Sequence, residues 1–474
     1  MIALSAAEIA EAVGGRLRGV ADPHSLVLTD ADTDSRNMRP GALFIAKPGE
    51  TTDGHRFIDR ALAAGAELVL AQRDTDTPSG APHPAVIVDD AVAAMGRLAA
   101  ELVGRIRAHS PTTVIGITGS AGKTTTKDLL AALLRPEGPT VAPQGSYNGE
   151  VGVPLTVFGA ELETRYLIIE MGADAPGNIR DLCEMVRPDI GAVLMVGTAH
   201  AGKFGGAERI AATKAELAEL ASQQVILNAD DAQVAAMAQR ASAPITWFGE
   251  SAEADIRAEN LRLDEQGHPM FDLVPAAGIR VSSGLIGAHH VGNLLAAAAV
   301  ALCLGVAPED VAGRLNGLGP SSRWRMERTD RPDGVTVIND AYNANPESMR
   351  EALRTLAILT RGEAAGGHRR SVAVLGSMLE LGDDARWRHH QLGETVVRLN
   401  IDLTLVVGED AYPLYRGAIA EGSWGSEVHW VADAEEAEAW LKDALAPGDV
   451  VLFKSSRDAG LRLLGDKVAA DERN

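Results

Sequence analysis

The sequence is poor in cysteine and has no apolar run long enough to span a membrane. Its two cysteines, Cys183 and Cys303, lie far apart, outside any CxxC pair and away from clustered histidines. We therefore expect reduced core residues of a cytosolic protein, with neither a disulfide framework nor a zinc site. The longest apolar run, Leu294–Ala307, is shorter than the roughly 20 residues that a membrane span needs, and it predicts a buried helix.

Basic residues are also scarce relative to acidic ones. Lys plus Arg is 44 and Asp plus Glu is 65, so the formal net charge is −21. This balance argues against general nucleic-acid binding, which needs a basic surface to displace counterions. The N-terminus contains Glu8 and Glu11 and no basic region, so we expect no secretory signal and an intracellular protein. Phosphate ligands remain possible, because a few placed cations or backbone N–H groups bind them locally.

The length of the chain predicts several domains. A chain of 474 residues has room for three domains of roughly 150 residues. With 46% hydrophobic and 23% charged residues, it has the composition of a folded globular protein and not of a disordered or fibrous one. The domains are expected at residues 1–110, 111–319 and 320–474. Apolar runs alternate with helical patterns throughout, which predicts the α/β fold class, with a small N-terminal α/β domain, a central domain with a parallel sheet and a C-terminal doubly wound, Rossmann-like domain.

Apolar runs bounded by turn residues predict the strands of these domains. The expected strands are 42–46, 67–70 and 85–88 in the first domain, 114–118, 166–170, 190–196 and 225–228 in the second, and 335–340, 372–376, 403–407, 427–431 and 450–454 in the third. Residues 256–285 predict a small antiparallel insert, and residues 317–334, with Gly and Pro at both ends, predict an inter-domain linker. The adjacent His389 and His390 are expected on a solvated helix face.

The strongest motif is TGSAGKTT at Thr118–Thr125, where an apolar strand ends and a helical pattern begins at Lys123. Glycines at 119 and 122 let backbone N–H groups point at phosphate oxygens, and the helix N-terminus adds its positive end. Lys123 is then placed to reach the β- and γ-phosphates, and the Thr124 hydroxyl to bind Mg²⁺. The first glycine of the general pattern is replaced by Ile117, so this is a shorter form of the loop. The motif predicts an ATP-binding domain.

Two further positions are candidate ligands of the metal that accompanies a nucleoside triphosphate. Glu170 ends a buried apolar strand. Ligands bind at the carboxyl ends of parallel strands, so a metal role is favoured over a carboxylate that only caps the strand in water. His200 follows another strand. A single histidine is usually an ordinary loop or core residue, so the residue pattern alone does not make it a ligand.

Lys214 falls on the apolar stripe of the helix predicted over 207–221, which also contains Ile210 and Leu217. The side chain is therefore expected to point inward. One interpretation is a lysine whose stem packs while its ammonium reaches water. The other is a desolvated lysine of lowered pKa that takes up CO₂ as a carbamate and becomes anionic. The sequence leaves both open.

Taken together, the motifs resemble those of the Mur ligase family of peptidoglycan synthesis over nearly the whole chain. The first domain contains TDSR at Thr33–Arg36, and the second adds NGEVGVPLT at Asn148–Thr156 to the phosphate loop. The third contains DAYNANPESM at Asp340–Met349 and LGSMLELG at Leu375–Gly382. The DxYNANPxSM string is the most discriminating, because sister ligases that add earlier residues have a His-containing sequence there. Folate polyglutamate synthetases share the ATPase core without this first domain.

The resemblance implies a reaction as well as a fold. It implies an ATP-dependent acid–amino-acid ligase that adds D-alanyl-D-alanine to UDP-N-acetylmuramoyl-tripeptide through an acyl phosphate. ATP and Mg²⁺ would be its cofactors, the cytoplasm its location and a monomer its expected state, with no nucleic-acid partner and no membrane insertion. The third residue of the tripeptide, diaminopimelate or lysine, stays open.

The resemblance also implies roles for single residues. The triphosphate would be held by Gly119, Ser120, Ala121, Gly122, Lys123, Thr124 and Thr125. Metal would be bound by Thr124, Glu170, His200 and, if carbamylated, Lys214. The catalytic set would be Lys123, Lys214, Glu170 and His200.

Further positions follow from the same resemblance. Those near the nucleotide are Asn148 at the phosphates, Asn293 (after His290) at the adenine, Arg325 as the linker arginine that reaches ATP, and Asp340 on the ribose or metal side. Arg323 remains an alternative to Arg325. Substrate would contact Tyr342, Asn343 and Asn345 in the cleft and, for the UDP-sugar, Ser35 and Arg36. The KSSR string at Lys454–Arg457 resembles a KGSR string of the family, with Ser455 in place of the glycine.

The sequence is also compatible with two alternatives to this ligase. One is a Mur-type ligase for another amino acid. The other belongs to a different class, a P-loop NTPase or phosphotransferase whose outer domains only bind partners. The absence of a kinase-type catalytic loop, and a strand-end motif in the third domain, weigh against the second alternative.

Overall fold

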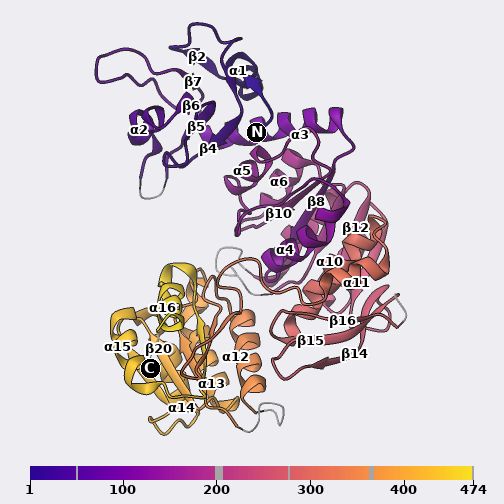
Figure 1. Cartoon of the computed structure of the whole chain (residues 1–474), viewed down its shortest axis with the longest axis vertical. Coiled ribbons are helices and arrows are strands. Elements are labelled where there is room, and N and C mark those ends of the chain that lie inside the picture. The colour runs from indigo at the N-terminus through magenta and orange to yellow at the C-terminus, as the bar shows by residue number, and fades with distance from the viewer. Residues whose placement is uncertain (50–51, 198–205, 276–277, 362–367, 472–474) are drawn as a thin grey trace.

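The computed structural model describes residues 1–49, 52–197, 206–275, 278–361 and 368–471. These residues form three α/β domains that follow one another along an elongated molecule, each built around its own main sheet (Figure 1). The predicted fold class is therefore confirmed. No helix within the described residues has both the length and the apolar character needed to cross a membrane.

The N-terminal domain packs its helices against a five-stranded sheet of order β2-β7-β6-β5-β4. Strands β4 to β7 are parallel, β2 is antiparallel at the edge, and β1 and β3 form a separate short pair. The elements are β1 (Leu4–Ser5), α1 (Ala6–Val13), β2 (Arg16–Arg18), β3 (Val27–Leu28), β4 (Asp30–Asp32), β5 (Ala42–Ala46), α2 (Ile58–Ala63), β6 (Ala66–Ala71), β7 (Ala85–Ile87) and α3 (Ala91–His109).

The central domain is built on a nine-stranded sheet of order β16-β15-β14-β13-β12-β11-β8-β10-β9. The sheet is parallel from β9 to β14, and β15 and β16 extend it as antiparallel strands. The predicted antiparallel insert is thus a continuation of the parallel sheet. The strands are β8 (Thr113–Thr118), β9 (Thr140–Val141), β10 (Tyr166–Glu170), β11 (Ile190–Val193), β12 (Gln224–Asn228), β13 (Ile245–Gly249), β14 (Ile256–Leu263), β15 (Pro269–Val274) and β16 (Arg280–Ser282).

Helices cover both faces of this sheet, as its parallel connections require. The helices are α4 (Lys123–Leu134), α5 (Gly152–Phe158), α6 (Asn178–Val186), α8 (Ala207–Leu220), α9 (Ala232–Ala236), α10 (Val291–Cys303) and α11 (Pro308–Leu315). Helix α10 has apolar residues on all sides and lies buried against α4 and the sheet. This confirms the buried helix predicted from the longest apolar run.

The C-terminal domain has a doubly wound sheet of order β17-β18-β22-β19-β20-β21, parallel except for β17 at its edge. Pro346 begins helix α12, where its fixed φ suits the first turn. The elements are β17 (Glu327–Asp330), β18 (Thr336–Asn339), α12 (Pro346–Arg361), β19 (Ser371–Leu375), α13 (Ala385–Arg398), β20 (Leu403–Val407), α14 (Tyr412–Glu421), β21 (Val428–Val431), α15 (Ala434–Ala444), β22 (Val450–Lys454) and α16 (Leu461–Ala469).

Helix α3 joins the first two domains through one hydrophobic core. Its residues Leu98 and Leu102 are fully buried, in a cluster that contains Ile9 of the N-terminal domain and Val157 and Ile179 of the central domain. Its N-terminus is capped by Asp90, whose side chain accepts hydrogen bonds from the next turn. The two domains therefore share apolar contacts that fix the N-terminal domain beside one end of the central sheet.

Three expectations from the sequence are corrected. The segment predicted as a linker contains β17, which pairs antiparallel with β18 because the backbone of β18 offers an open sheet edge. Cys303 is exposed at the end of α10, while Cys183 is buried as expected. His389 is 1% exposed instead of solvated. Its Nδ1 donates to the Ala385 carbonyl at 2.7 Å and its Nε2 accepts from Met378 N at 2.9 Å, so both ring nitrogens are satisfied and the ring can be buried.

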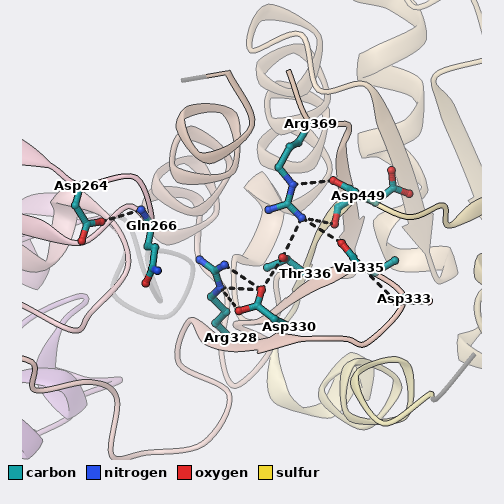
Figure 2. Close-up of polar contacts among 11 residues, drawn as sticks. Asp264, Gln266, Arg328, Asp330, Asp333, Val335, Thr336, Arg369 and Asp449 are labelled. Atoms are coloured by element: carbon teal, nitrogen blue, oxygen red, sulfur yellow. Dashed lines mark hydrogen bonds and ion pairs between the residues drawn. The ribbon is translucent and has the colours of Figure 1, made fainter. Parts of the chain in front are cut away.

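The central and C-terminal domains also meet away from their main cleft (Figure 2). The turn between β14 and β15 faces Arg328 and Arg369 across a small cavity of about 160 Å³. Arg328 pairs with Asp330 at 2.9 Å. Gly267 in this turn has φ +80°, and a Cβ there would lie 2.6 Å from the Leu359 Cδ2 of α12. The turn thus approaches α12 closely, which supports the position of the C-terminal domain against the central sheet.

Candidate functional site

A cleft of about 1660 Å³ lies where the three domains meet. Its walls include Pro48 and Gln72 of the N-terminal domain, the loop before α4 in the central domain, and residues around α12 and after β22 in the C-terminal domain. The carboxyl ends of β8 and β10 open into it, as expected for ligand sites of parallel sheets.

The phosphate loop has the backbone that its sequence predicts. Strand β8 ends at Thr118, and α4 begins at Lys123. Gly122 adopts φ +84°, and a Cβ at this position would lie 2.1 Å from the Asn293 Oδ1 of α10. Only glycine meets both conditions, which explains why this residue type stands directly before the lysine.

Lys123 lies folded over the loop. Its Nζ donates to the Gly119 carbonyl at 2.8 Å. Burial lowers the pKa of this ammonium, while the nearby Glu170 carboxylate opposes the shift and Arg325 adds to it. A cation held in this desolvated place interacts strongly with any anion that enters the loop.

Glu170 is the fully buried carboxylate of the site. Its Oε2 accepts from the Thr124 hydroxyl at 2.9 Å, and its Oε1 accepts from Ser146 Oγ at 2.7 Å and Asn148 Nδ2 at 2.9 Å. Three neutral donors thus fix the orientation of one carboxylate between β10 and the start of α4. Ser146 was not selected from the sequence, because a serine in a loop has no spacing that distinguishes it.

These oxygens are of the type that Mg²⁺ prefers. The Thr124 hydroxyl and the Glu170 carboxylate lie together at the mouth of the phosphate loop, so the donor set fits a hard divalent cation shared with phosphate oxygens. Within the described ranges, no cluster of three or more His, Cys, Asp or Glu side chains could hold a metal by itself. His200, the other candidate ligand, lies outside the described residues.

Lys214 of α8 points inward, as its position on the apolar stripe predicts. It is 5% exposed and lines the cleft. Burial, and then the charge of Lys123, lower its pKa to about 7. A substantial fraction of this amine is therefore neutral and nucleophilic near neutral pH.

The segment before β17 places one arginine in the cleft and the other outside it. Arg325 Nη2 donates to Thr124 Oγ1 at 3.3 Å, and its guanidinium lies 4.5 Å from the Tyr342 ring centroid. Arg323 instead pairs with Asp466 at 3.0 Å and covers the Trp324 ring. Of the two arginines left open by the sequence, the structure places Arg325 at the phosphate loop.

Asp340 holds this segment in position from the C-terminal domain. Its Oδ1 accepts from the Met326 backbone N–H at 3.1 Å, and its Oδ2 lies 2.5 Å from Lys454 Nζ. Lys454 also donates to the Asn343 carbonyl at 3.2 Å. Since Met326 directly follows Arg325, the Asp340–Lys454 pair helps to fix the direction in which that arginine points.

The predicted substrate-binding residues divide into those that line the cleft and those that do not. Asn345 Nδ2 donates to the Ser120 carbonyl at 3.3 Å, and Asn343 and Asn345 both line the cleft. Tyr342 lies behind Arg325 and stacks on Trp324. Ser35 and Arg36 are not among the residues that line the cleft, and Arg36 pairs with Asp34 at 2.6 Å.

A polar pair lies on the far side of the loop. Asn293 Nδ2 donates to His290 Nδ1 at 3.2 Å, and its Oδ1 accepts from Thr126 Oγ1 at 3.3 Å. Burial lowers the pKa of both His289 and His290 and so favours neutral rings. In the described part of the chain, His289 Nδ1 and His290 Nε2 are buried without a hydrogen-bond partner, and both residues line the cleft. His289 was missed because the resemblance pointed only to its neighbours.

Comparisons with known proteins agree with this geometry. Three family models match the chain: the Mur ligase family catalytic domain at residues 31–103, the Mur ligase middle domain at residues 117–301 and the Mur ligase glutamate ligase domain at residues 324–457. The chain belongs to the Mur ligase family. Its phosphate loop lies in the middle domain of this family, and Arg325 and Asp340 lie in the glutamate ligase domain.

Individual Mur ligases match this chain from end to end. A protein of Mycobacterium tuberculosis named UDP-N-acetylmuramoyl-tripeptide–D-alanyl-D-alanine ligase is 44% identical, over 100% of this chain and 99% of its own length. A crystal structure of MurF from Acinetobacter baumannii superposes with a TM-score of 0.86 at 29% identity, covering 99% of both chains. MurF from Thermotoga maritima in complex with ADP has a TM-score of 0.77 at 27% identity, covering 94% of this chain and 98% of that one.

The close approach of Gly122 to Asn293 generates a prediction for this Mur ligase. Gly122→Ala is expected to weaken nucleotide binding at least roughly tenfold, because the new Cβ displaces Asn293 and a left-handed alanine costs about 1–2 kcal/mol. Calorimetric titration with ADP and ATP measures the effect. Gly104→Ala is the matched control, since a Cβ at this α3 position meets nothing within 4 Å. Wild-type nucleotide affinity in Gly122→Ala would contradict the prediction.

Proposed function

We propose that this Mur ligase joins D-alanyl-D-alanine to UDP-N-acetylmuramoyl-tripeptide at the expense of ATP, as a step in peptidoglycan precursor synthesis. The observation that carries the proposal is the convergence of Lys123, Thr124 and Glu170 of the central domain with Arg325 at the entry to the C-terminal domain. The 44% identity between this chain and a ligase named for this reaction, over the full length of both, supports the choice of substrates.

The chemistry needs an activated carboxylate, because a free carboxylate would have to lose oxide. The tripeptide carboxylate oxygen attacks the γ-phosphorus of ATP, the bond to the β-phosphate oxygen breaks, and ADP leaves. The dipeptide nitrogen then attacks the acyl phosphate carbon, and the tetrahedral intermediate loses phosphate and a proton to give the amide. Phosphorylation and amide formation both take place among anionic groups, so cations aimed at the transferring group stabilise the transition state. Lys123 and Arg325 are placed to do this.

Mg²⁺ is proposed as the metal of the site, held by Thr124 and Glu170 and by His200. When bound, Mg²⁺ neutralises charge on the phosphate oxygens. The protein's own part is to fix the carboxylate: the hydrogen bonds from Ser146 and Asn148 hold Glu170 in one orientation. We place the triphosphate on residues 119–125.

The adenosine end is assigned to the polar pair beyond the loop. Asn293 and His290 are positioned by each other and line the cleft, so they are proposed to contact adenine. Asp340 is proposed to contact the ribose, and Asn343 and Asn345 the substrates between the domains. The N-terminal domain, residues 1–110, is proposed to bind the UDP-sugar through Ser35 and Arg36.

We propose residues 111–319 and 320–474 as the remaining two domains. The second is proposed to bind ATP, and the third to bring the dipeptide and close over the nucleotide. We also propose a monomer as the working unit, since residues of all three domains of the chain line the cleft. We propose the cytoplasm as its location, because ATP and UDP-activated sugars are used there.

The ligase proposal predicts a strict dependence on two substrates. Purified protein with ATP should release phosphate only when both UDP-N-acetylmuramoyl-tripeptide and D-alanyl-D-alanine are present, since the acyl phosphate is consumed by the amine. Phosphate release and the ligated product are measured together. Comparable phosphate release with either substrate omitted would favour an NTPase or phosphotransferase, and product formed only with another amino acid would favour a different Mur-type ligase. Lysine- and diaminopimelate-containing tripeptides, assayed side by side, identify the third residue.

Lys214 is proposed to act as a carbamate, because a buried amine with a pKa near 7 is neutral enough to add CO₂. Lys214→Ala should abolish ligation, with partial rescue by a short carboxylate such as acetate. Because the lowered pKa makes the neutral amine more abundant as pH rises through about 7, carbamate labelling by ¹³C-bicarbonate should be stronger at pH 8 than at pH 6. Full activity in Lys214→Arg would exclude a carbamate.

A further inference from the structure

Besides Arg325, the C-terminal domain presents three arginines to the cleft: Arg350, Arg354 and Arg457. Two of them have carboxylate partners on α12, since Arg350 lies 3.6 Å from Glu347 and Arg354 lies 2.6 Å from Glu351. Among the residues that the structure describes, no carboxylate lies within ion-pair distance of the Arg457 guanidinium. Arg457 is therefore the arginine of this wall that remains available for an anionic ligand.

Arg457 lies close to the reacting end of the cleft. It follows β22, and its guanidinium is 5.9 Å from the Tyr342 ring centroid. The same ring holds Arg325 at 4.5 Å, and Arg325 reaches Thr124 at the phosphate loop. Because Arg325 already faces the phosphates, a second anion that binds Arg457 would lie beside them and on the C-terminal side.

An apolar surface adjoins this arginine. Leu379 lines the cleft and is 37% exposed. Its backbone N–H donates to Ser456 Oγ at 2.9 Å, and Ser456 N donates to the Ser377 carbonyl at 2.9 Å. Ser456 is 4% exposed and directly precedes Arg457, so these hydrogen bonds hold the Leu379 backbone against the residue next to Arg457. The hydrogen bond from Met378 N to His389 fixes the same segment from α13.

We propose that Arg457 binds the carboxylate of the incoming dipeptide and that Leu379 packs against its methyl groups. This inference rests on the proposed function, which supplies the dipeptide as second substrate. D-Alanyl-D-alanine has one carboxylate, two methyl groups and an amine that must reach the acyl phosphate. Two residues span at most about 7 Å, so the carboxylate has to be anchored close to the phosphates, where Arg457 lies. A planar guanidinium suits a carboxylate because it forms two parallel hydrogen bonds.

The test compares Arg457→Gln with wild type on D-alanyl-D-alanine and on its C-terminal amide, which lacks the carboxylate. The substitution is expected to raise KM for the dipeptide on the order of 10- to 100-fold, as for loss of a charged hydrogen bond, with KM for ATP unchanged. For wild type, KM for the amide should exceed KM for the dipeptide by a similar factor. For Arg457→Gln, the KM values for the dipeptide and the amide should be nearly equal. Arg457→Lys, which keeps the charge, should retain part of the preference for the carboxylate.

Arg354→Gln is the matched control, because this arginine lines the same cleft but has its own partner in Glu351. It should behave as wild type toward both compounds. The inference is overturned if Arg457→Gln keeps the wild-type preference for the carboxylate, or if it raises KM for ATP instead. Absence of any ligated product from wild-type protein would instead defeat the proposed function, so the two failures are distinct.

Leu379 is tested with diglycine, which keeps the carboxylate and lacks the methyl groups. Wild type should prefer D-alanyl-D-alanine over diglycine, and Leu379→Ala should reduce that preference several-fold. The upper bound is the value of a methylene in a fully apolar pocket, about 1–3 kcal/mol or 10- to 200-fold. An unchanged preference in Leu379→Ala would remove the leucine from the proposed site.

Discussion

The hydrogen bond between Thr124 and Glu170 is the contact on which the arrangement of the cleft depends. It joins the first turn of α4 to the last residue of β10, and the same threonine hydroxyl receives Arg325 from the entry to the third domain. A buried carboxylate is costly unless its oxygens are satisfied. Ser146 and Asn148 complete that requirement, so a loop that carries no regular structure is held against the sheet.

Charge is distributed very unevenly over the molecule. The whole chain has a formal charge of −21, yet Lys123 and Lys214 line the cleft, Lys454 lies buried against Asp340, and burial lowers the pKa of each ammonium. A cation kept from water interacts more strongly with an anion than one on the surface. Local placement, and not net charge, therefore accounts for how an acidic protein can bind anionic nucleotides and substrates.

Much of the fold could be predicted because it depends on local patterns. Strands β8, β10, β11 and β12 of the central sheet follow from apolar runs, whereas β9 and β13 were not predicted. Strand β17 could not be predicted, since its residues are polar and form a strand only where β18 offers an open edge. His389 was misplaced for a similar reason: its burial depends on an N–H from the distant Met378.

For the site, the sequence by itself determined the phosphate loop, because a glycine with positive φ followed by lysine and threonine is a local requirement of the backbone. It also determined that Glu170 ends a strand and that Lys214 faces inward. Only the tertiary structure decided that Arg325 and not Arg323 reaches the loop, that Ser146 donates to the Glu170 carboxylate, and that Leu379 is bonded to Ser456, the residue before Arg457. These choices depend on contacts between residues far apart in the chain, and their distances are set by how three domains pack together.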